Sequence, residues 1–231
     1  MPCPFDDIPF VGNGAVLTSP SGGSLTPDYP RISLKGGKFT AIGSDAELDP
    51  EVLHVVIVGA NPKLSKTWYS KPWSDEGEPS SPECFSLDGI TPDLSIEKPQ
   101  NDLCATCPQN AWGSRITDTG QQVKACSDQK RLAVVVLSAI DGPIYLLQVT
   151  PASLKGLNQY HKQLSVRGIL PEVVKTKISF DTEARFPKLV FNFGGFLDTE
   201  TQNVVDKYFG SEEVRIITGE KRRYTGDLED E

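Results

Sequence analysis

No stretch of the 231-residue chain reaches the run of about 18 apolar residues that a membrane-spanning helix needs. The N-terminus also lacks a basic region followed by an apolar stretch, so no secretory leader is expected. These absences predict a protein of the reducing cytoplasm. In that compartment, clustered cysteines more often bind a metal or form a redox pair than build a disulfide framework.

Motifs of common enzyme classes are absent as well. The chain has no phosphate-binding Gly-x-x-x-x-Gly-Lys-Ser/Thr loop, no Gly-x-Ser-x-Gly elbow and no His-Glu-x-x-His zinc motif. Histidine is scarce, and both His54 and His161 fall in predicted regular elements, where structural roles are expected. The sequence therefore predicts a binding protein and no enzyme.

Cysteine is concentrated in one region. Four of the five cysteines form the pattern C-x19-C-x2-C-x18-C, at Cys84, Cys104, Cys107 and Cys126. Two thiolates two residues apart commonly form half of a tetrahedral zinc site, so we expect these four residues to bind zinc. A four-cysteine iron–sulfur cluster, a redox Cys-x-x-Cys pair and four unlinked thiols are open alternatives.

All three tryptophans lie between residues 68 and 112, and segment 63–73 combines aromatic and basic residues with no acid. Single-stranded nucleic acid is held by aromatic rings stacked on bases and by cations along the phosphates. We therefore expect this region to bind a strand. The predicted contacts are Lys63, Lys66, Trp68, Tyr69, Lys71, Trp73, Trp112, Arg115, Lys130 and Arg131.

A net charge of −8 argues against non-specific binding of a polyanion, but the charges are segregated. The last seven residues, 225–231, hold four acids and no base. We expect this acidic tail to contact partner proteins or to compete with a strand for the basic region.

The remaining pattern predicts a mainly β domain with helices. Apolar and β-branched runs indicate strands at 53–59, 131–138, 144–150, 173–182 and 187–193, and a hairpin at 31–42. Helices are predicted at 151–165, where Pro151 follows Thr150, and at 198–209. Residues 61–130 show little strand or helix pattern, and a loop of that length needs something to order it.

This element order is that of the five-stranded OB-fold barrel, with a helix between strands three and four. The long metal-pinned loop would join strands one and two, where OB folds hold oligonucleotides. Another α+β domain with the same order is the alternative. The predicted organisation is an irregular arm at 1–30, an OB domain at 31–218 with the four-cysteine lobe at 61–130, and a basic then acidic tail at 219–231.

The segment Cys104-Ala-Thr-Cys107-Pro-Gln-Asn-Ala-Trp112-Gly-Ser-Arg115, followed by Lys124-Ala-Cys126, resembles bacteriophage proteins of the single-stranded-DNA-binding type. The acidic C-terminus is similar to the tails by which such proteins recruit replication enzymes. The resemblance covers residues 63–135 best. It implies a role in DNA replication or recombination, in the host cytoplasm if the protein is phage-encoded.

We therefore expect a sequence-tolerant single-stranded DNA-binding protein. Two other classes are open: a protein-interaction module with a structural zinc site, and an iron–sulfur or redox protein.

Overall fold

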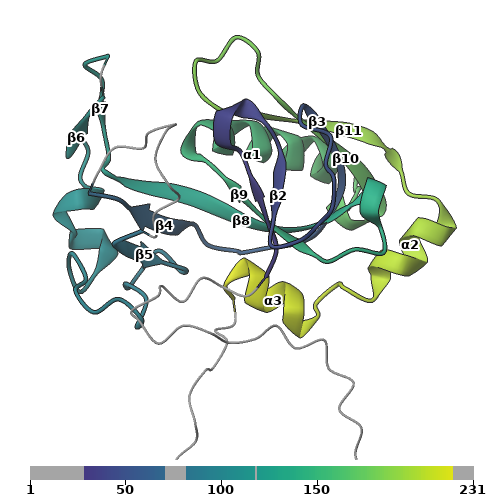
Figure 1. The fold of residues 1–231 in the computed structure, drawn as a ribbon, viewed down its shortest axis with the longest axis horizontal. Coiled ribbons are helices and arrows are strands. Elements are labelled where there is room, and N and C mark those ends of the chain that lie inside the picture. The colour runs from purple at the N-terminus through teal and green to yellow at the C-terminus, as the bar shows by residue number, and fades with distance from the viewer. Residues whose placement is uncertain (1–28, 71–81, 118, 221–231) are drawn as a thin grey trace, which may run out of the picture.

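The computed structural model of the protein describes residues 29–70, 82–117 and 119–220. Over these residues the chain is mainly β with three α-helices (Figure 1). Most of the predicted arm and tail lies outside the described residues. None of the described helices is long and apolar enough to cross a membrane.

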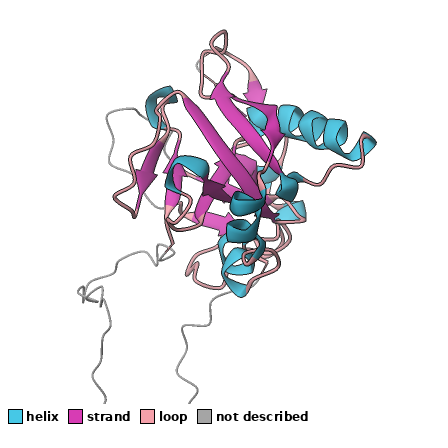
Figure 2. Cartoon of the chain, turned by 90° about the vertical axis from the view of Figure 1, so that its right-hand side faces the viewer, coloured by secondary structure: helices cyan, strands magenta, loops and turns pink. Residues whose placement is uncertain are grey.

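The main sheet has the strand order β11-β10-β3-β8-β9-β1-β2. Its strands are β1 (Arg31–Ser33), β2 (Thr40–Ile42), β3 (Val52–Ala60), β8 (Cys126–Val136), β9 (Tyr145–Val149), β10 (Val174–Phe180) and β11 (Leu189–Phe196). Neighbours are antiparallel except β1 and β9, which are parallel. The sheet curls into a half-barrel, with strands crossing at different angles in Figure 2.

The segment between β3 and β8 forms a lobe, which we call the cysteine lobe (residues 61–125). Its short strands are β4 (Ser65–Trp68), β5 (Cys84–Ser86), β6 (Arg115–Ile116) and β7 (Gln122–Val123). β4 pairs with β5 on one side and with the first residues of β8 on the other, while β6 and β7 form a separate hairpin. That hairpin stands at the upper left of Figure 1.

Both faces of the central strands are buried, which explains their continuous apolar runs. In β3, Val55 and Ile57 belong to the core beneath α1, whereas Val56 and Val58 point to the opposite core. The first core also contains Leu157, Tyr160 and Leu164 of α1 (Pro151–Val166). The second core contains Val205 of α2 (Thr199–Asp206) together with Val214 and Ile217 of α3 (Glu212–Thr218).

The helices begin and end at residues with clear local causes. Pro151 occupies the first turn of α1, where its missing N–H costs no hydrogen bond. The side chains of Asp198 and Ser211 accept hydrogen bonds from Thr201 and Val214 at the starts of α2 and α3. Gly219 ends α3 with a φ of 83°, the left-handed conformation that glycine adopts without strain.

The strands, hairpin and helices predicted from the sequence are present, with bounds that differ by a few residues. Before β8, the described residues of 61–130 hold only short strands and 3-10 turns. β8 begins at Cys126, five residues before the predicted strand, and β4 pairs with that extension. α3 was not predicted.

Candidate functional site

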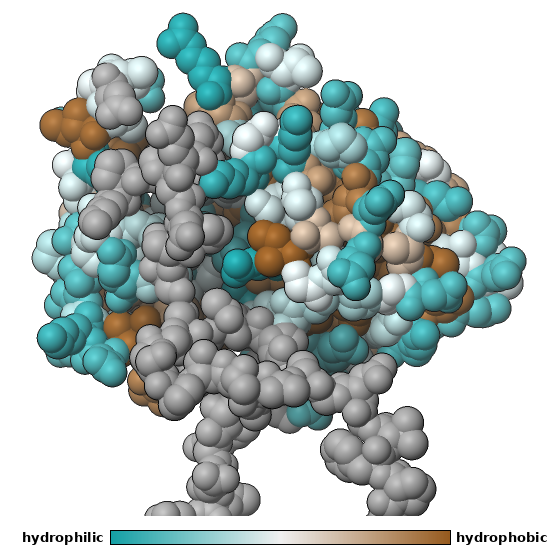
Figure 3. All heavy atoms as spheres, viewed as in Figure 1, coloured by the Kyte–Doolittle hydropathy of each residue, from teal (hydrophilic) through white to brown (hydrophobic). Residues whose placement is uncertain are grey.

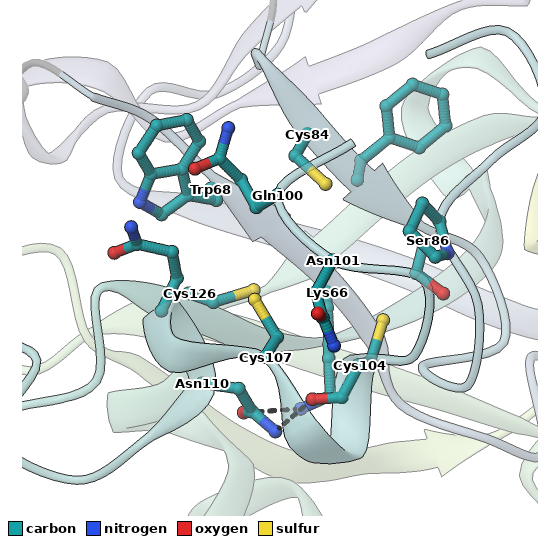
Figure 4. A pocket seen from close by; sticks show the side chains of 13 residues that line it. Lys66, Trp68, Cys84, Ser86, Gln100, Asn101, Cys104, Cys107, Asn110 and Cys126 are labelled. Atoms are coloured by element: carbon teal, nitrogen blue, oxygen red, sulfur yellow. Dashed lines mark hydrogen bonds between the residues drawn. The ribbon is translucent and has the colours of Figure 1, made fainter. Parts of the chain in front are cut away.

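Three separate segments of the chain bring Cys84, Cys104, Cys107 and Cys126 to one cavity of about 10 Å³ (Figure 4). Cys84 begins β5 and Cys126 begins β8, and Trp68 at the end of β4 pairs with both. The strand pairing of the cysteine lobe therefore fixes two of the cysteines on either side of one tryptophan.

Of the other two cysteines, Cys104 begins a short 3-10 turn, Cys104–Thr106, and Cys107 caps its end. The N–H of Cys107 donates to the carbonyl of Cys104 at 3.4 Å, and the Asn110 side-chain amide donates to the same carbonyl at 2.8 Å. The N–H of Cys104 donates to the carbonyl of Ile90 at 2.8 Å, which anchors the turn to the rest of the lobe. The backbone around Cys104 and Cys107 is thus held by hydrogen bonds that do not involve the thiols.

All four residues are free thiols. Burial raises the pKa of Cys126 to about 11 and also raises the pKa of Cys104, while the positive charge of Lys66 lowers both in part. These two thiols are therefore protonated at neutral pH, and a bound metal ion would have to displace their protons.

A cavity of this size matches one water molecule or one ion, and four sulfur ligands are the donor set that zinc or an iron–sulfur centre uses. The sulfurs of Cys107 and Cys126 face each other in Figure 4, with Cys84 and Cys104 on other sides of the cavity. Within the described ranges, no three His, Cys, Asp or Glu side chains are already arranged as a metal site. Four-fold coordination therefore requires side-chain rotations from this arrangement.

A buried ion pair supports the same cavity. Lys66, whose side chain is 12% exposed, pairs with Asp128 of β8 and donates to the Asn110 amide oxygen at 3.0 Å. Burial alone would raise the pKa of Asp128, but hydrogen bonds and charge from Lys66 and Lys124 outweigh burial and lower it. The ammonium group of Lys66 is thus partly buried and already paired with Asp128, and its predicted phosphate contact stays a prediction.

Arg131 is also engaged by other parts of the protein. It is 5% exposed, and its guanidinium donates to the carbonyls of Ile217 at 2.7 Å and Thr218 at 3.1 Å and to the Tyr29 hydroxyl. These bonds satisfy carbonyls at the end of α3 and give Arg131 a structural role, while its predicted phosphate contact stays a prediction. Nothing in the local sequence distinguishes it from an exposed arginine.

The aromatic residues divide by exposure. Trp68 is half-buried against the cysteine cavity, and Tyr69 is 36% exposed. Trp112 is 72% exposed, which is unusual for so large an apolar side chain. Lys71 and Trp73 lie outside the described residues.

A rigid turn presents Trp112 to solvent. The Ser114 hydroxyl donates to the carbonyl of Gln109 at 2.9 Å and accepts from the N–H of Ala125 at 2.8 Å. Arg115, on β6, is partly exposed and donates to the carbonyl of Tyr69. Figure 3 shows a hydrophobic patch at the β6–β7 hairpin, where Ile116 is 66% exposed.

Two further predicted cations lie at the start of the cysteine lobe and in β8. Lys63 is exposed just after β3. Burial lowers the pKa of Lys130, whose ammonium group donates to the carbonyl of Pro62 at 3.2 Å. The structure thus keeps Lys63, Lys130 and Arg115 near solvent. It also adds Asn110 and Asp128, which the sequence analysis did not single out, to the surroundings of the cysteine cavity.

Comparison of the chain with protein-family models, with curated proteins and with solved structures finds no match. The functional assignment therefore depends on the geometry of the cysteine cavity and of the surface around Trp112.

Proposed function

We propose that this protein binds single-stranded DNA in a sequence-tolerant manner, with the surface around Trp112 as its stacking platform. The observation that carries the proposal is the 72% exposure of Trp112 on a hydrogen-bonded turn beside the partly exposed Arg115. An exposed indole on such a turn, with a cation three residues further along the chain, can stack on a base while the cation contacts a phosphate. Such stacking tolerates any base, because every base has a π-face.

The strand pairing is compatible with an OB fold. β3 pairs with both β8 and β10, β8 pairs with β9, β10 pairs with β11, and α1 lies between β9 and β10 in sequence. In that assignment, the cysteine lobe is the loop between strands one and two, and residues 181–188 are the loop between strands four and five. OB folds bind oligonucleotides with these two loops. In Figure 1 both the β6–β7 hairpin and the loop before β11 rise above the sheet.

The loop between β10 and β11 also has side chains suited to a strand. Phe186 is 57% exposed and Arg185 is exposed beside it, with no side-chain partner among the described residues. This loop therefore offers an aromatic ring and a free cation, as the surface around Trp112 offers Trp112 and Arg115. We propose that the two loops contact the same strand.

We further propose that Cys84, Cys104, Cys107 and Cys126 bind zinc. A structural zinc ion would tie together the turn at Cys104–Thr106 and the starts of β5 and β8, and would add folding free energy to a lobe with few apolar core residues. An iron–sulfur cluster would use the same ligands and would make the purified protein brown. In this proposal the metal orders the surface that carries Trp112 and takes no part in chemistry.

The proposed setting is DNA replication or recombination in the cytoplasm, with the acidic tail at 227–231 contacting partner proteins. This setting depends on the resemblance to phage single-strand binders and on the charge of the tail.

The first experiment is a titration of the purified full chain with a dT oligonucleotide, followed by tryptophan fluorescence at two salt concentrations. Strand binding should quench the fluorescence, and the affinity should fall steeply as salt rises because bound counterions are released. No quenching, together with no shift in a gel-shift assay, would contradict the proposal.

A protein-interaction module is the second candidate, favoured by exposed apolar side chains on the cysteine lobe. Leu94 is 86% exposed, and Ile90 and Leu103 are each 48% exposed. An apolar protein interface would bind with little dependence on salt, which separates it from strand binding in the same titration.

A further inference from the structure

A second candidate contact surface lies at the end of α3. An open cavity of about 340 Å³ lies between the end of β3, the turn after β5 and the last turn of α3. It is lined by Asn61, Pro62, Lys63, Leu87, Asp88, Arg215, Gly219 and Glu220. In Figure 1, α3 lies at the bottom of the molecule and the β6–β7 hairpin at the upper left, with β4 and β5 between them.

Hydrogen bonds hold the walls of this cavity in place. The Asn61 side-chain amide donates to the carbonyls of Leu87 and Thr218, both at 2.9 Å, and so joins the turn after β5 to the end of α3. A Cβ at Gly219 would lie 3.3 Å from atoms of Leu87 and Arg131, so the chain packs tightly there. The cavity is therefore formed before any ligand binds.

The cavity holds both cations and acids. Burial alone would raise the pKa of Asp88, but hydrogen bonds and the positive charge of Lys63 lower it, so these two side chains attract each other. Lys63 and Arg215 are exposed, and neither side chain makes a hydrogen bond or ion pair with the part of the chain that the structure describes. The Asp88 carboxylate accepts from the Ser86 hydroxyl at 3.0 Å and from the N–H of Ile90 at 2.8 Å.

The second acid is engaged in the same way, since the Glu220 carboxylate accepts from the Thr218 hydroxyl at 3.1 Å. Lys130 adds a third cation nearby, because its ammonium group donates to the carbonyl of Pro62. With Lys130, three cations lie at the cavity against two carboxylates, so positive charge is in excess there. The three residues that follow Glu220 in the sequence, 221–223, are also basic.

We infer that this cavity binds a phosphate group of the DNA strand, with Arg215 and Lys63 as its ligands. The inference depends on the proposed function. A guanidinium group can bind two phosphate oxygens at once, and a lysine ammonium group can supply a further contact as a point charge. A strand held at this cavity and at Trp112 would cross the cysteine lobe, so the lobe would lie at the centre of the binding surface.

The test compares Arg215→Gln and Lys63→Gln with Arg167→Gln, a matched control. Arg167 is exposed just after α1, and its side chain has no partner in the described ranges. Each full-length variant is titrated into a dye-labelled dT oligonucleotide of about 30 nucleotides, longer than the largest typical OB-fold site. Fluorescence anisotropy then gives the binding constant at several salt concentrations.

Loss of one phosphate contact should make the slope of log K against log salt shallower by about 0.7. We expect this change, with a several-fold loss of affinity at low salt, for Arg215→Gln and Lys63→Gln. Arg215→Lys should lose less, and Arg167→Gln should match the wild-type protein. All replaced side chains are exposed, so equal melting temperatures should exclude misfolding as the cause.

Two failures are distinguishable. If the wild-type chain binds no strand, the proposed function fails and this inference fails with it. If the wild-type chain binds but Arg215→Gln and Lys63→Gln behave like Arg167→Gln, the phosphate contact is refuted and the proposed function stands. Equal losses of affinity in all three variants would also refute the phosphate contact, because they would result from the change in net charge and not from this cavity.

Discussion

Replacing Trp112 with alanine is expected to weaken strand binding while leaving the fold intact. Stacking contributes about 1–3 kcal/mol per base, and each 1.4 kcal/mol is a tenfold change in affinity. The dissociation constant should therefore rise about 5- to 150-fold. Because Trp112 is 72% exposed, less than a third of its surface is buried. The loss in unfolding free energy should then stay below about 2 kcal/mol.

The assay measures both quantities on the same preparations. Anisotropy of a labelled dT oligonucleotide gives the dissociation constant, and urea denaturation gives the free energy of unfolding. Trp112→Phe should keep part of the affinity because it keeps an aromatic ring. Leu94→Ala is the control, since it removes a more exposed apolar side chain from the same lobe without removing a ring. A dissociation constant for Trp112→Ala within twofold of the wild-type value would refute the stacking role.

Three further predictions concern the lobe and the tail. Mass spectrometry of metals should find about one zinc ion per chain. The Cys107→Ser variant should lose the ion and melt at a lower temperature. An unchanged metal content in this variant would remove Cys107 from the ligand set. Asp128→Asn leaves the buried Lys66 without a charged partner and should cost about 1.5–3 kcal/mol of unfolding free energy in urea at pH 7. Folding lowers the pKa of Asp128, so this stabilisation is present above its unfolded pKa, near 3.9, and is lost as the pH falls through its folded pKa. The difference in unfolding free energy between the two proteins should therefore shrink below about pH 4. A difference that stays constant with pH would contradict the ion-pair explanation. Deleting residues 226–231 should tighten strand binding at low salt, and unchanged affinity would show that the acidic tail does not compete.

Elements with strong local signals could be predicted from the sequence. In segment 53–59, every residue that the structure buries is apolar, which is the signal of a strand buried on both faces. Pro151 likewise marks the start of α1. α3 was missed although its signal was present: Ser211 is a good N-cap, two acids follow it, and Val214 and Ile217 lie on one face.

Pairing between distant segments could not be read in the same way. β4 is Ser-Lys-Thr-Trp, and the part of β8 that it pairs with is equally polar, so neither segment looks like a strand in isolation. The four cysteines line one cavity, but their spacing alone could not give the positions of the side chains, and metal binding by them stays a prediction. The burial of Lys66 and Arg131 was missed because their partners, Asp128 and the end of α3, are distant in sequence.

β8 has a consequence for how the molecule unfolds. Its first four residues, 126–129, pair with β4 in the cysteine lobe, and residues 130–136 pair with β3 and β9 in the main sheet. One continuous strand therefore belongs to both parts, which leaves no linker about which the lobe could rotate. Backbone amides of the two parts should exchange with solvent deuterium as one cooperative unit, so occupation of the cysteine cavity should slow exchange along β8 well into the sheet.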